Sequence, residues 1–489
     1  MQNVDLKKPE FKRVSNVTWE IPETFKEGMR VPVRVYASEK LLKEMDLQVF
    51  DQAANIAMIP GITKYSFVMA DGHSGYGSPI GGVSAFDIHK GGVISPGIVG
   101  FDINCGMRLV LTSLTLEDIR PKIKELTDAL FKKVPAGVGS KSKLALSKQD
   151  FVELAESGSK WAIKKGYGWK EDLDATELNG IADWADDSKI SEKAVQRGVT
   201  QIGTLGSGNH YLEIQYIKPE NIKDSAIAKK WGLFPNQVVI MFHTGSRGAG
   251  HQIASDYIQI FLKVMERKYK IKVNDKELAC APFNSNEGRD YYKAMGCGIN
   301  ISFANRQLIL HRIREAFSET FKKDAEKLGL RQLFDIAHNR ASLEEHEVDG
   351  EAKELLVHRK GSTGSYPPGR REIPKKFRAD GSPVIIGGSM ETGSYLLVGG
   401  SNADDTFDST AHGSGRTMSR TRARKTTNGK ELFQKMLKNG IYVKSVSWSG
   451  LAEEGGESYK DIDEVVNSVD KAGLSKKVCK FIPLANVKG

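Results

Sequence analysis

The chain has 489 residues, of which 39% are hydrophobic, 27% charged and 8% aromatic, a composition typical of a globular protein. It excludes a coiled coil, a collagen-like fibre and a largely disordered chain. The 71 Lys and Arg residues outnumber the 61 Asp and Glu residues, and the formal net charge of +10 favours a polyanionic partner. No apolar run approaches the length of a membrane span, and residues 1–14 lack the apolar core of a secretory signal. We therefore expect a cytoplasmic protein without a membrane segment.

The first half of the chain contains three types of segment. Apolar residues at helical spacing predict a helix over 38–58, and residues 65–110 read as short apolar strands broken by glycine turns. Residues 115–200 are polar and mostly helical in pattern, and we expect them to form a peripheral segment. The tryptophans in this segment indicate that it packs against other parts of the protein: Trp161, Trp169 and Trp184.

From residue 200 onward, apolar runs repeatedly meet clusters of Gly, His, Asn or Ser, the kind of position where rigid scaffolds place chemistry. Two helices are predicted between them, over 253–267 and 305–328. We predict a mixed α/β (α+β) fold with central β-sheets and surrounding helices. Because candidate residues from 71 to 488 must converge, we expect one catalytic domain over residues 1–489.

Several common nucleotide-binding motifs are missing from the sequence. It has no phosphate-binding loop of the form G-x-x-x-x-G-K-[ST], and the glycines at 203–208 do not match G-x-G-x-x-G opening a helix. The K-x-D-G signature of common ATP-dependent ligases is also absent. A nucleotide would have to be bound by a site of another kind.

A set of residues suited to metal binding is spread along the chain. Asp102 and Cys105 are three residues apart, and three histidines each end an apolar, strand-like run: His210, His243 and His338. Three imidazoles, a carboxylate and a thiolate are enough for a two-metal site. A thiolate with imidazoles suits zinc, while the carboxylate admits manganese. Each histidine taken alone is equally explained as a core or surface residue.

The other cysteines carry a different expectation. Cys280, Cys297 and Cys479 form no C-x-x-C pair, which argues against a disulfide scaffold and a zinc knuckle. We expect them to be reduced and to pack as small hydrophobic residues.

His412 lies in a segment suited to phosphate chemistry. Gly413 and Gly415 free the backbone to approach a phosphate, and Arg416 and Arg420 offer guanidinium groups. A histidine in such surroundings can act as a nucleophile toward phosphorus, although a surface loop explains the segment as well. The following run contains Arg422, Arg424, Lys425 and Lys430, and it indicates either contact with an RNA backbone or a solvated basic face. The same two interpretations apply to a second run of basic residues, His358, Arg359 and Lys360.

Together these segments resemble the RtcB family of RNA-splicing ligases. The matching pieces run nearly end to end: DGHSGYGSPIGGV, GGVISPG, GFDINCGMR, GSGNHYLE, HTGSRG, AHNRA, HRKG, GSM-x-x-x-SY, AHGSGR-x-MSR and a C-terminal VKG. The resemblance implies a GTP- and manganese-dependent ligase that joins RNA 3′-phosphate or 2′,3′-cyclic phosphate ends to 5′-hydroxyl ends. It further implies RNA partners such as tRNA exon halves and broken RNA ends, an activating partner of the archease type, and a monomer.

The resemblance also assigns roles to residues. His412 would take GMP from GTP, with Asp71 and Arg247 assisting, and two Mn²⁺ ions would be held by Asp102, Cys105, His210, His243 and His338. RNA contacts would fall on Arg197, Arg416, Arg420 and Arg422. Nucleotide contacts would fall on Asn209, His210, Tyr211, Leu212, Glu213, His338, Asn339, Gly387, Gly388, Ser389, Met390, Ser394, His412, Gly413, Ser414, Gly415 and Lys488. Because the nucleophile must be an unprotonated imidazole, guanylylation is expected to decline below about pH 6.

Two other functions stay open on the sequence. A metal-dependent phosphoesterase acting on RNA ends would keep the metal ligands but would need neither GTP nor His412. An RNA-binding protein with a decayed active site would not need its ligands at all, and the intact set from Cys105 to His412 speaks against it.

Overall fold

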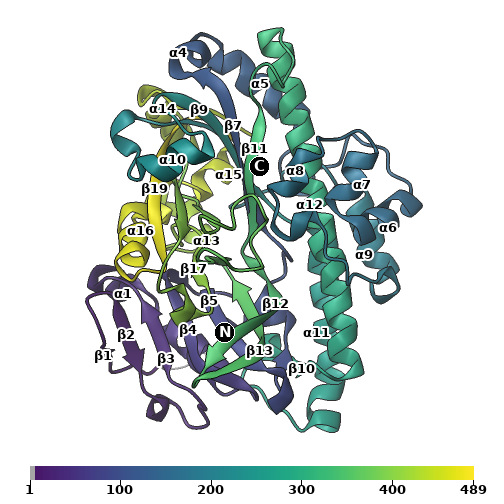
Figure 1. Cartoon of the computed structure of the whole chain (residues 1–489), viewed down its shortest axis with the longest axis vertical. Helices are drawn as coiled ribbons and strands as arrows, with labels where there is room; N and C mark the ends of the chain where they lie inside the picture. Colours follow the sequence, from purple (N-terminus) through teal and green to yellow (C-terminus); the bar gives the residue numbers. More distant parts are fainter. Residues whose placement is uncertain (1–5) are drawn as a thin grey trace.

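The computed structural model describes residues 6–489, which form two large β-sheets with helices packed around them (Figure 1). One sheet has seven strands and the other has eight, and two further sheets have two strands each. The predicted mixed α/β fold with central sheets and surrounding helices is confirmed. No helix within residues 6–489 combines the length and the apolar composition that crossing a membrane requires.

The seven-stranded sheet has the order β1-β2-β3-β4-β5-β13-β12. Neighbouring strands are antiparallel except β3 and β4, which are parallel. The strands are β1 Lys12–Arg13, β2 Thr18–Ile21, β3 Val33–Tyr36, β4 Ile62–His73, β5 Ile80–Asp87, β13 Glu351–Lys360 and β12 Asn339–Val348.

The eight-stranded sheet has the order β11-β7-β9-β8-β19-β16-β15, with β18 parallel to β19 and all other neighbours antiparallel. The strands are β11 Arg331–Ala337, β7 Gly106–Thr115, β9 Gln237–Thr244, β8 Tyr211–Tyr216, β19 Ser475–Lys488, β16 Ser394–Gly399, β15 Pro383–Ile386 and β18 Tyr442–Ser445. The two small sheets pair β6 Val93–Ile94 with β10 Ala281–Pro282, and β14 Ser362–Gly364 with β17 Ser409–Ala411.

The α-helices cover both sheets, and the long helices α11 and α12 run together along one side (Figure 1). The first nine are α1 Glu39–Glu44, α2 Leu47–Ala57, α3 Pro96–Val99, α4 Leu116–Ile119, α5 Ile123–Lys133, α6 Lys148–Ser157, α7 Ser159–Lys164, α8 Glu171–Asp174 and α9 Glu192–Val199. The others are α10 Ser225–Trp231, α11 Arg247–Tyr269, α12 Asn286–Phe321, α13 Arg420–Thr426, α14 Gly429–Lys438, α15 Trp448–Glu453 and α16 Ile462–Lys471.

The helical pattern of residues 115–200 corresponds to α4–α9, of which α6 and α7 pack on the outer side of α12 (Figure 1). Trp161 is buried in this contact region, which agrees with the prediction that the segment over 115–200 packs against other parts of the protein. The helix expected over 38–58 is two helices, because the chain is extended at Met45 and Asp46, the C-cap of α1 and the N-cap of α2.

Both bounds of the helix predicted over 305–328 are wrong. Helix α12 begins nineteen residues earlier, at Asn286, where the Ser285 hydroxyl accepts a hydrogen bond from the Gly288 amide, and it ends at Phe321. Between Tyr291 and Leu310 the helix is buried on almost every side. A helix buried all round shows no apolar stripe, so periodicity cannot reveal it.

Strand direction in the eight-stranded sheet determines where the predicted site forms. Because β11, β7, β9, β8 and β19 alternate in direction, the ends of β11, β9 and β19 meet the starts of β7 and β8 at one edge. In register, Gly106 pairs with Thr244, Tyr211 with His243, and Lys488 with Tyr211. His210 therefore precedes its strand, and the prediction that it ends one is wrong.

A buried charge network holds this edge together. The Asp335 carboxylate accepts hydrogen bonds from Arg108 Nε (2.6 Å) and from Arg306 Nε and Nη2 (2.8 Å each), and all three side chains are fully buried. Arg306 Nη1 also donates to the carbonyl oxygens of Asn104 (2.8 Å) and Thr244 (3.1 Å). The network thus links α12, β11 and β7 to the backbone beside two candidate metal ligands: Asn104 precedes Cys105, and Thr244 follows His243.

Replacing Arg306 should destabilise the protein strongly. In Arg306→Met the Asp335 carboxylate keeps only one cationic partner. The Thr244 carbonyl loses the Arg306 donor, and that of Asn104 keeps only the Ser302 hydroxyl (2.7 Å). We expect this change to cost about 3–5 kcal/mol. Thermal unfolding followed by circular dichroism measures the effect. Arg267→Met on the exposed face of α11 is the matched control and should leave the melting temperature within about 1 °C. Equal melting temperatures for the two variants would contradict this account.

Candidate active site

A cavity of about 1100 Å³ opens at the edge where these strands meet. Residues from distant parts of the sequence line it, because the alternating strands deliver them to the same place. Its lining includes many of the predicted site residues: Asp102, Cys105, Asn209, His210, Arg247, His338, Asn339, His412 and Arg420.

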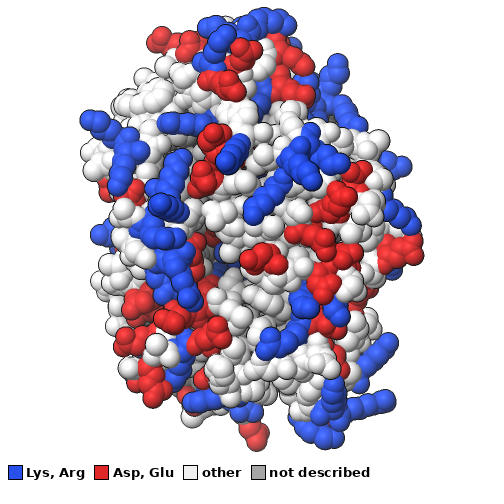
Figure 2. Space-filling model, turned by 45° about the vertical axis from the view of Figure 1, so that its right-hand side comes forward, with Lys and Arg blue, Asp and Glu red and all other residues white. Residues whose placement is uncertain are grey.

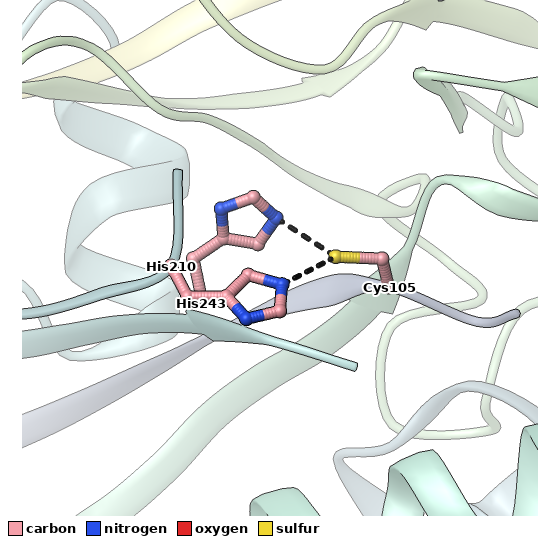
Figure 3. A group of neighbouring side chains, drawn as sticks. All are labelled: Cys105, His210 and His243. Atoms are coloured by element: carbon pink, nitrogen blue, oxygen red, sulfur yellow. Dashed lines mark hydrogen bonds between the residues drawn. The ribbon is translucent and has the colours of Figure 1, made fainter. Parts of the chain in front are cut away.

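The five predicted metal ligands form one cluster, and four of them line this cavity: Asp102, Cys105, His210 and His338. Cys105 Sγ lies 3.4 Å from His210 Nε2 and 3.2 Å from His243 Nε2, and both rings turn that nitrogen toward the sulfur (Figure 3). His243 Nε2 lies 3.1 Å from His338 Nε2, and His210 Nε2 lies 3.0 Å from Asp102 Oδ2. Five donor groups therefore converge on one place.

The second nitrogen of two rings decides the tautomer. His210 Nδ1 lies 3.0 Å from the Leu205 carbonyl oxygen, and His243 Nδ1 lies 2.9 Å from that of Asn209. A carbonyl oxygen only accepts, so we assign the N–H to Nδ1 in both rings, which leaves the lone pairs of Nε2 facing the cluster. Burial lowers the pKa of His210 and His243, so neutral rings are favoured.

This arrangement is electrostatically unbalanced unless a cation joins it. His210 Nε2 faces a carboxylate, and His243 Nε2 faces both a sulfur and another ring nitrogen. Burial, and next the Asp102 carboxylate, raise the pKa of the Cys105 thiol well above its ordinary value. A metal ion would convert these repulsions into coordinate bonds and would hold the thiolate. The donor set therefore fits a metal.

The backbone around Cys105 is held in an uncommon conformation. Asn104 has φ of +56°, in the left-handed region that asparagine tolerates better than most residues, and its side chain is buried. The backbone amide of Asn104 donates to the backbone carbonyl oxygen of Asn339 (2.6 Å), and its backbone carbonyl oxygen accepts a hydrogen bond from Arg306. These contacts direct Cys105 toward the histidines.

His412 lies directly beside the cluster. The centroids of its ring and the His338 ring are 4.6 Å apart. His412 Nδ1 is 2.6 Å from Asp71 Oδ2, and the same oxygen accepts hydrogen bonds from the amides of His412 (3.0 Å) and Gly413 (3.1 Å). Burial alone would raise the pKa of Asp71, but His412 lowers it below the ordinary value. The carboxylate stays ionised, favours the proton on Nδ1 and leaves Nε2 with a free lone pair.

The segments expected to contact a nucleotide are joined to the His412 segment. The Gly387 amide donates to the His412 carbonyl oxygen (3.2 Å), and the Ser414 amide donates to that of Gly387 (2.9 Å). The Gly388 amide donates to Ser394 Oγ (3.3 Å). A Cβ on Gly415, whose φ is +71°, would lie 2.1 Å from the Asp71 carbonyl oxygen, so only glycine fits there.

The remaining predicted nucleotide contacts surround these segments. Lys488 Nζ donates to the Gly208 carbonyl oxygen (3.1 Å) and pairs with Glu454 (3.0 Å). Burial raises the pKa of Glu213 to about 8, so near neutral pH its carboxyl group carries a proton that it can donate. The side chains of Leu212 and Met390 pack in hydrophobic clusters, while Tyr211, Ser389 and Asn339 lie around the same edge.

The cations proposed for RNA divide into two groups. Arg197, Arg420 and Arg422 are exposed, and Arg420 lines the cavity. Arg416 turns inward, where it pairs with the buried Glu454 (3.1 Å) and donates to the Glu453 carbonyl oxygen (2.8 Å). Acidic and basic side chains are interspersed over the face in Figure 2, so the net charge is not gathered in one field there.

The interpretation of His358, Arg359 and Lys360 as a basic surface is wrong. All three are buried. Arg359 pairs with Glu344 (2.5 Å), and His358 Nε2 accepts a hydrogen bond from the Ser95 amide (3.3 Å). Burial lowers the pKa of His358 to about 3 and leaves its ring neutral, while Arg359 and Lys360 find their partners inside the protein, which a run of basic letters does not reveal.

Ser246 contributes to the site without a recognisable sequence signal, whereas Arg247 is one of the residues that the family resemblance assigns. Ser246 Oγ donates to Asp102 Oδ1 (3.1 Å) and orients that carboxylate. Arg247, with φ of +57°, places its Nη1 3.5 Å from His210 Nδ1, and burial lowers its pKa.

The four cysteines are all unpaired and buried, as expected.

The comparisons with known proteins agree with this geometry. The family model described as tRNA-splicing ligase RtcB matches residues 52–489. A tRNA-splicing ligase RtcB of Thermococcus kodakarensis is 49% identical over 98% of both chains. Proteins of the same name from Methanococcus maripaludis and Aeropyrum pernix are 48% and 47% identical, each over 98% of this chain and 99% of its own length. The chain belongs to the RtcB family of tRNA-splicing ligases.

Proposed function

We propose that this protein is a GTP- and manganese-dependent RNA ligase that joins RNA 3′-phosphate or 2′,3′-cyclic phosphate ends to 5′-hydroxyl ends, in tRNA splicing and RNA repair. The observation that carries the proposal is the pairing of His412 with Asp71 directly beside the His338 ring of the metal-ligand cluster. A nucleophile toward phosphorus and a site for metal ions then share one cavity, as successive phosphoryl transfers require. Membership of the RtcB family supports the RNA substrate.

His412 would act first. Its Nε2 attacks the α-phosphorus of GTP, an N–P bond forms, and the bond to the bridging oxygen breaks so that pyrophosphate leaves. Asp71 holds the proton on Nδ1 and stabilises the positive charge that develops on the ring as Nε2 bonds to phosphorus. The amides around Gly413 and Ser414 lie where a phosphate can approach the backbone closely.

The same site would then serve RNA. An oxygen of the RNA 3′-phosphate attacks the guanylate phosphorus, and the histidine leaves, which gives RNA-(3′)pp(5′)G. The 5′-hydroxyl next attacks the phosphorus of the RNA 3′-phosphate, a 3′–5′ phosphodiester forms, and GMP leaves. A 2′,3′-cyclic phosphate end must first be opened by water to a 3′-phosphate.

Two Mn²⁺ ions would be held by Asp102, Cys105, His210, His243 and His338. When bound, they neutralise phosphate charge and stabilise the leaving group. The guanine base would meet the protonated Glu213 and Lys488, which offer donors to its acceptor atoms.

Further parts of the proposal concern the whole chain. Residues 1–489 would form one catalytic domain, since residues from Asp71 to Gly489 line or adjoin one cavity. An archease-type activator, a monomeric state and a cytoplasmic location stay predictions.

Loss of His412 should abolish guanylylation. Incubated with α-labelled GTP and manganese, the wild-type protein should acquire an acid-labile, base-stable label, and His412→Ala should acquire none, because no other group replaces the nucleophile. His89→Ala, an exposed histidine outside the cavity, is the matched control and should label fully. Equal labelling of His412→Ala and wild type would remove His412 from the role of nucleophile.

Asp71→Asn should keep the fold and slow guanylylation by about 10²–10⁴-fold. The amide still fills the space, but it removes the negative charge that stabilises the ring as the N–P bond forms. Single-turnover labelling with excess GTP separates this rate from RNA binding. A rate within threefold of wild type would mean that Asp71 only packs against the segment at 412–415.

Cys105→Ala should lower metal content and abolish ligation, because it removes the thiolate that faces two imidazoles. Metal is measured by mass spectrometry after dialysis against a series that includes Mn²⁺ and Zn²⁺. Cys280→Ala removes an equally buried cysteine that packs in a hydrophobic cluster, and it should retain both metal and activity. Unchanged metal content and ligation in Cys105→Ala would remove Cys105 from the metal site.

A further inference from the structure

The mouth of the active-site cavity carries a concentration of exposed hydrophobic side chains. Among residues 6–489, the large hydrophobic side chains that are exposed are Val14, Tyr76, Val138, Ile260, Leu437, Val446 and Trp448. Three of these seven line this one cavity: Tyr76, Val138 and Val446. Exposed apolar surface gathered beside a catalytic group indicates a surface that a ligand covers.

Tyr76 belongs to a row of three rings that leads toward the metal ligands. Its side chain is 74% exposed, and its ring meets Phe101 edge to face, with centroids 6.2 Å apart and planes at 82°. The Phe101 ring in turn lies 6.1 Å from that of His251, at 31°. All three rings line the cavity, and Phe101 immediately precedes Asp102. We call Tyr76, Phe101 and His251 the aromatic row.

The backbone that carries Tyr76 is firmly held although its ring is exposed. The Tyr76 carbonyl oxygen accepts hydrogen bonds from the buried Lys360 Nζ (2.7 Å) and from the Ser78 amide (2.8 Å). Lys360 also donates to Ser78 Oγ (3.0 Å) and to the Gly97 carbonyl oxygen (2.9 Å). Because this backbone is held, only the side-chain torsions of Tyr76 have to become ordered when a ligand covers the ring.

We propose that the aromatic row is the stacking platform for the terminal nucleobase of an RNA end that is to be joined, an inference that rests on the proposed ligase function. A nucleobase has two apolar π faces, and single-stranded RNA ends are held by stacking on aromatic side chains. Arg247, Arg420 and Arg424 line the same cavity and can meet the phosphates that flank such a base. Stacking accepts every base, so the platform should not discriminate sequence.

Steady-state kinetics of Tyr76 variants test the platform. In Tyr76→Ala we expect the KM for RNA to rise about tenfold with little change in kcat, because one stacking contact is lost. Guanylylation of His412 involves no RNA and should proceed at the wild-type rate, which also shows that the variant is folded. Tyr76→Phe keeps the ring and loses only the hydroxyl, so it is the matched control and should keep the wild-type KM.

Fluorescence reports the stacking itself and distinguishes the two RNA ends. RNAs with 2-aminopurine as the last base of the 3′-phosphate strand, or as the first base of the 5′-hydroxyl strand, are titrated with wild-type protein and with Tyr76→Ala. Quenching by wild type that is lost in Tyr76→Ala identifies which end uses the platform.

Three results would overturn the proposal: a wild-type KM in Tyr76→Ala, equal quenching by both proteins, or an effect of Tyr76→Ala seen only when a second protein is added, which would make the row a protein-docking surface. Failure of the ligase proposal is a separate result, because wild-type protein would then join no RNA at all.

Discussion

The buried contact between Arg306 and Asp335 is the constraint on which the site depends. Asp335 lies three residues before His338, while Arg306 binds the carbonyl groups of Asn104 and Thr244, the neighbours of Cys105 and His243. One guanidinium group, presented by a helix buried on almost every side, thereby sets the relative position of three strands. Without it, Asp335 would keep Arg108 as its only cationic partner, and each of the two carbonyl groups would lose a hydrogen-bond donor in a buried environment.

Two separate electrostatic arrangements meet in the cavity. The metal-ligand cluster gathers lone pairs and needs a cation, because neutral rings and a thiol face one another at 3.1–3.4 Å. His412 instead has its own carboxylate partner, Asp71, and needs no metal to orient its ring. Since the His338 and His412 rings are neighbours, a phosphate that approaches His412 also lies beside the metal-ligand cluster.

The convergence of Cys105, His210, His243 and His338 could be predicted from the sequence, because their ligand chemistry suggested one cluster. The burial of charge could not. Arg359 and Arg416 read as surface cations, yet each pairs with a buried glutamate, because a partner distant in sequence satisfies it. The length of α12 was also missed, since burial on almost every side removes the periodicity that identifies a helix.

The chemical groups of the site can be read from the amino-acid sequence: the thiol, the imidazoles, the carboxylates and the glycines that let the backbone approach a phosphate. Their meeting in space follows from the fold, because it depends on strand direction and pairing. Five alternating strands bring the residues before β7 and β8 beside those at the ends of β9, β11 and β19. Strand order is set by long-range packing and hydrogen bonding, and no local pattern along the chain encodes it.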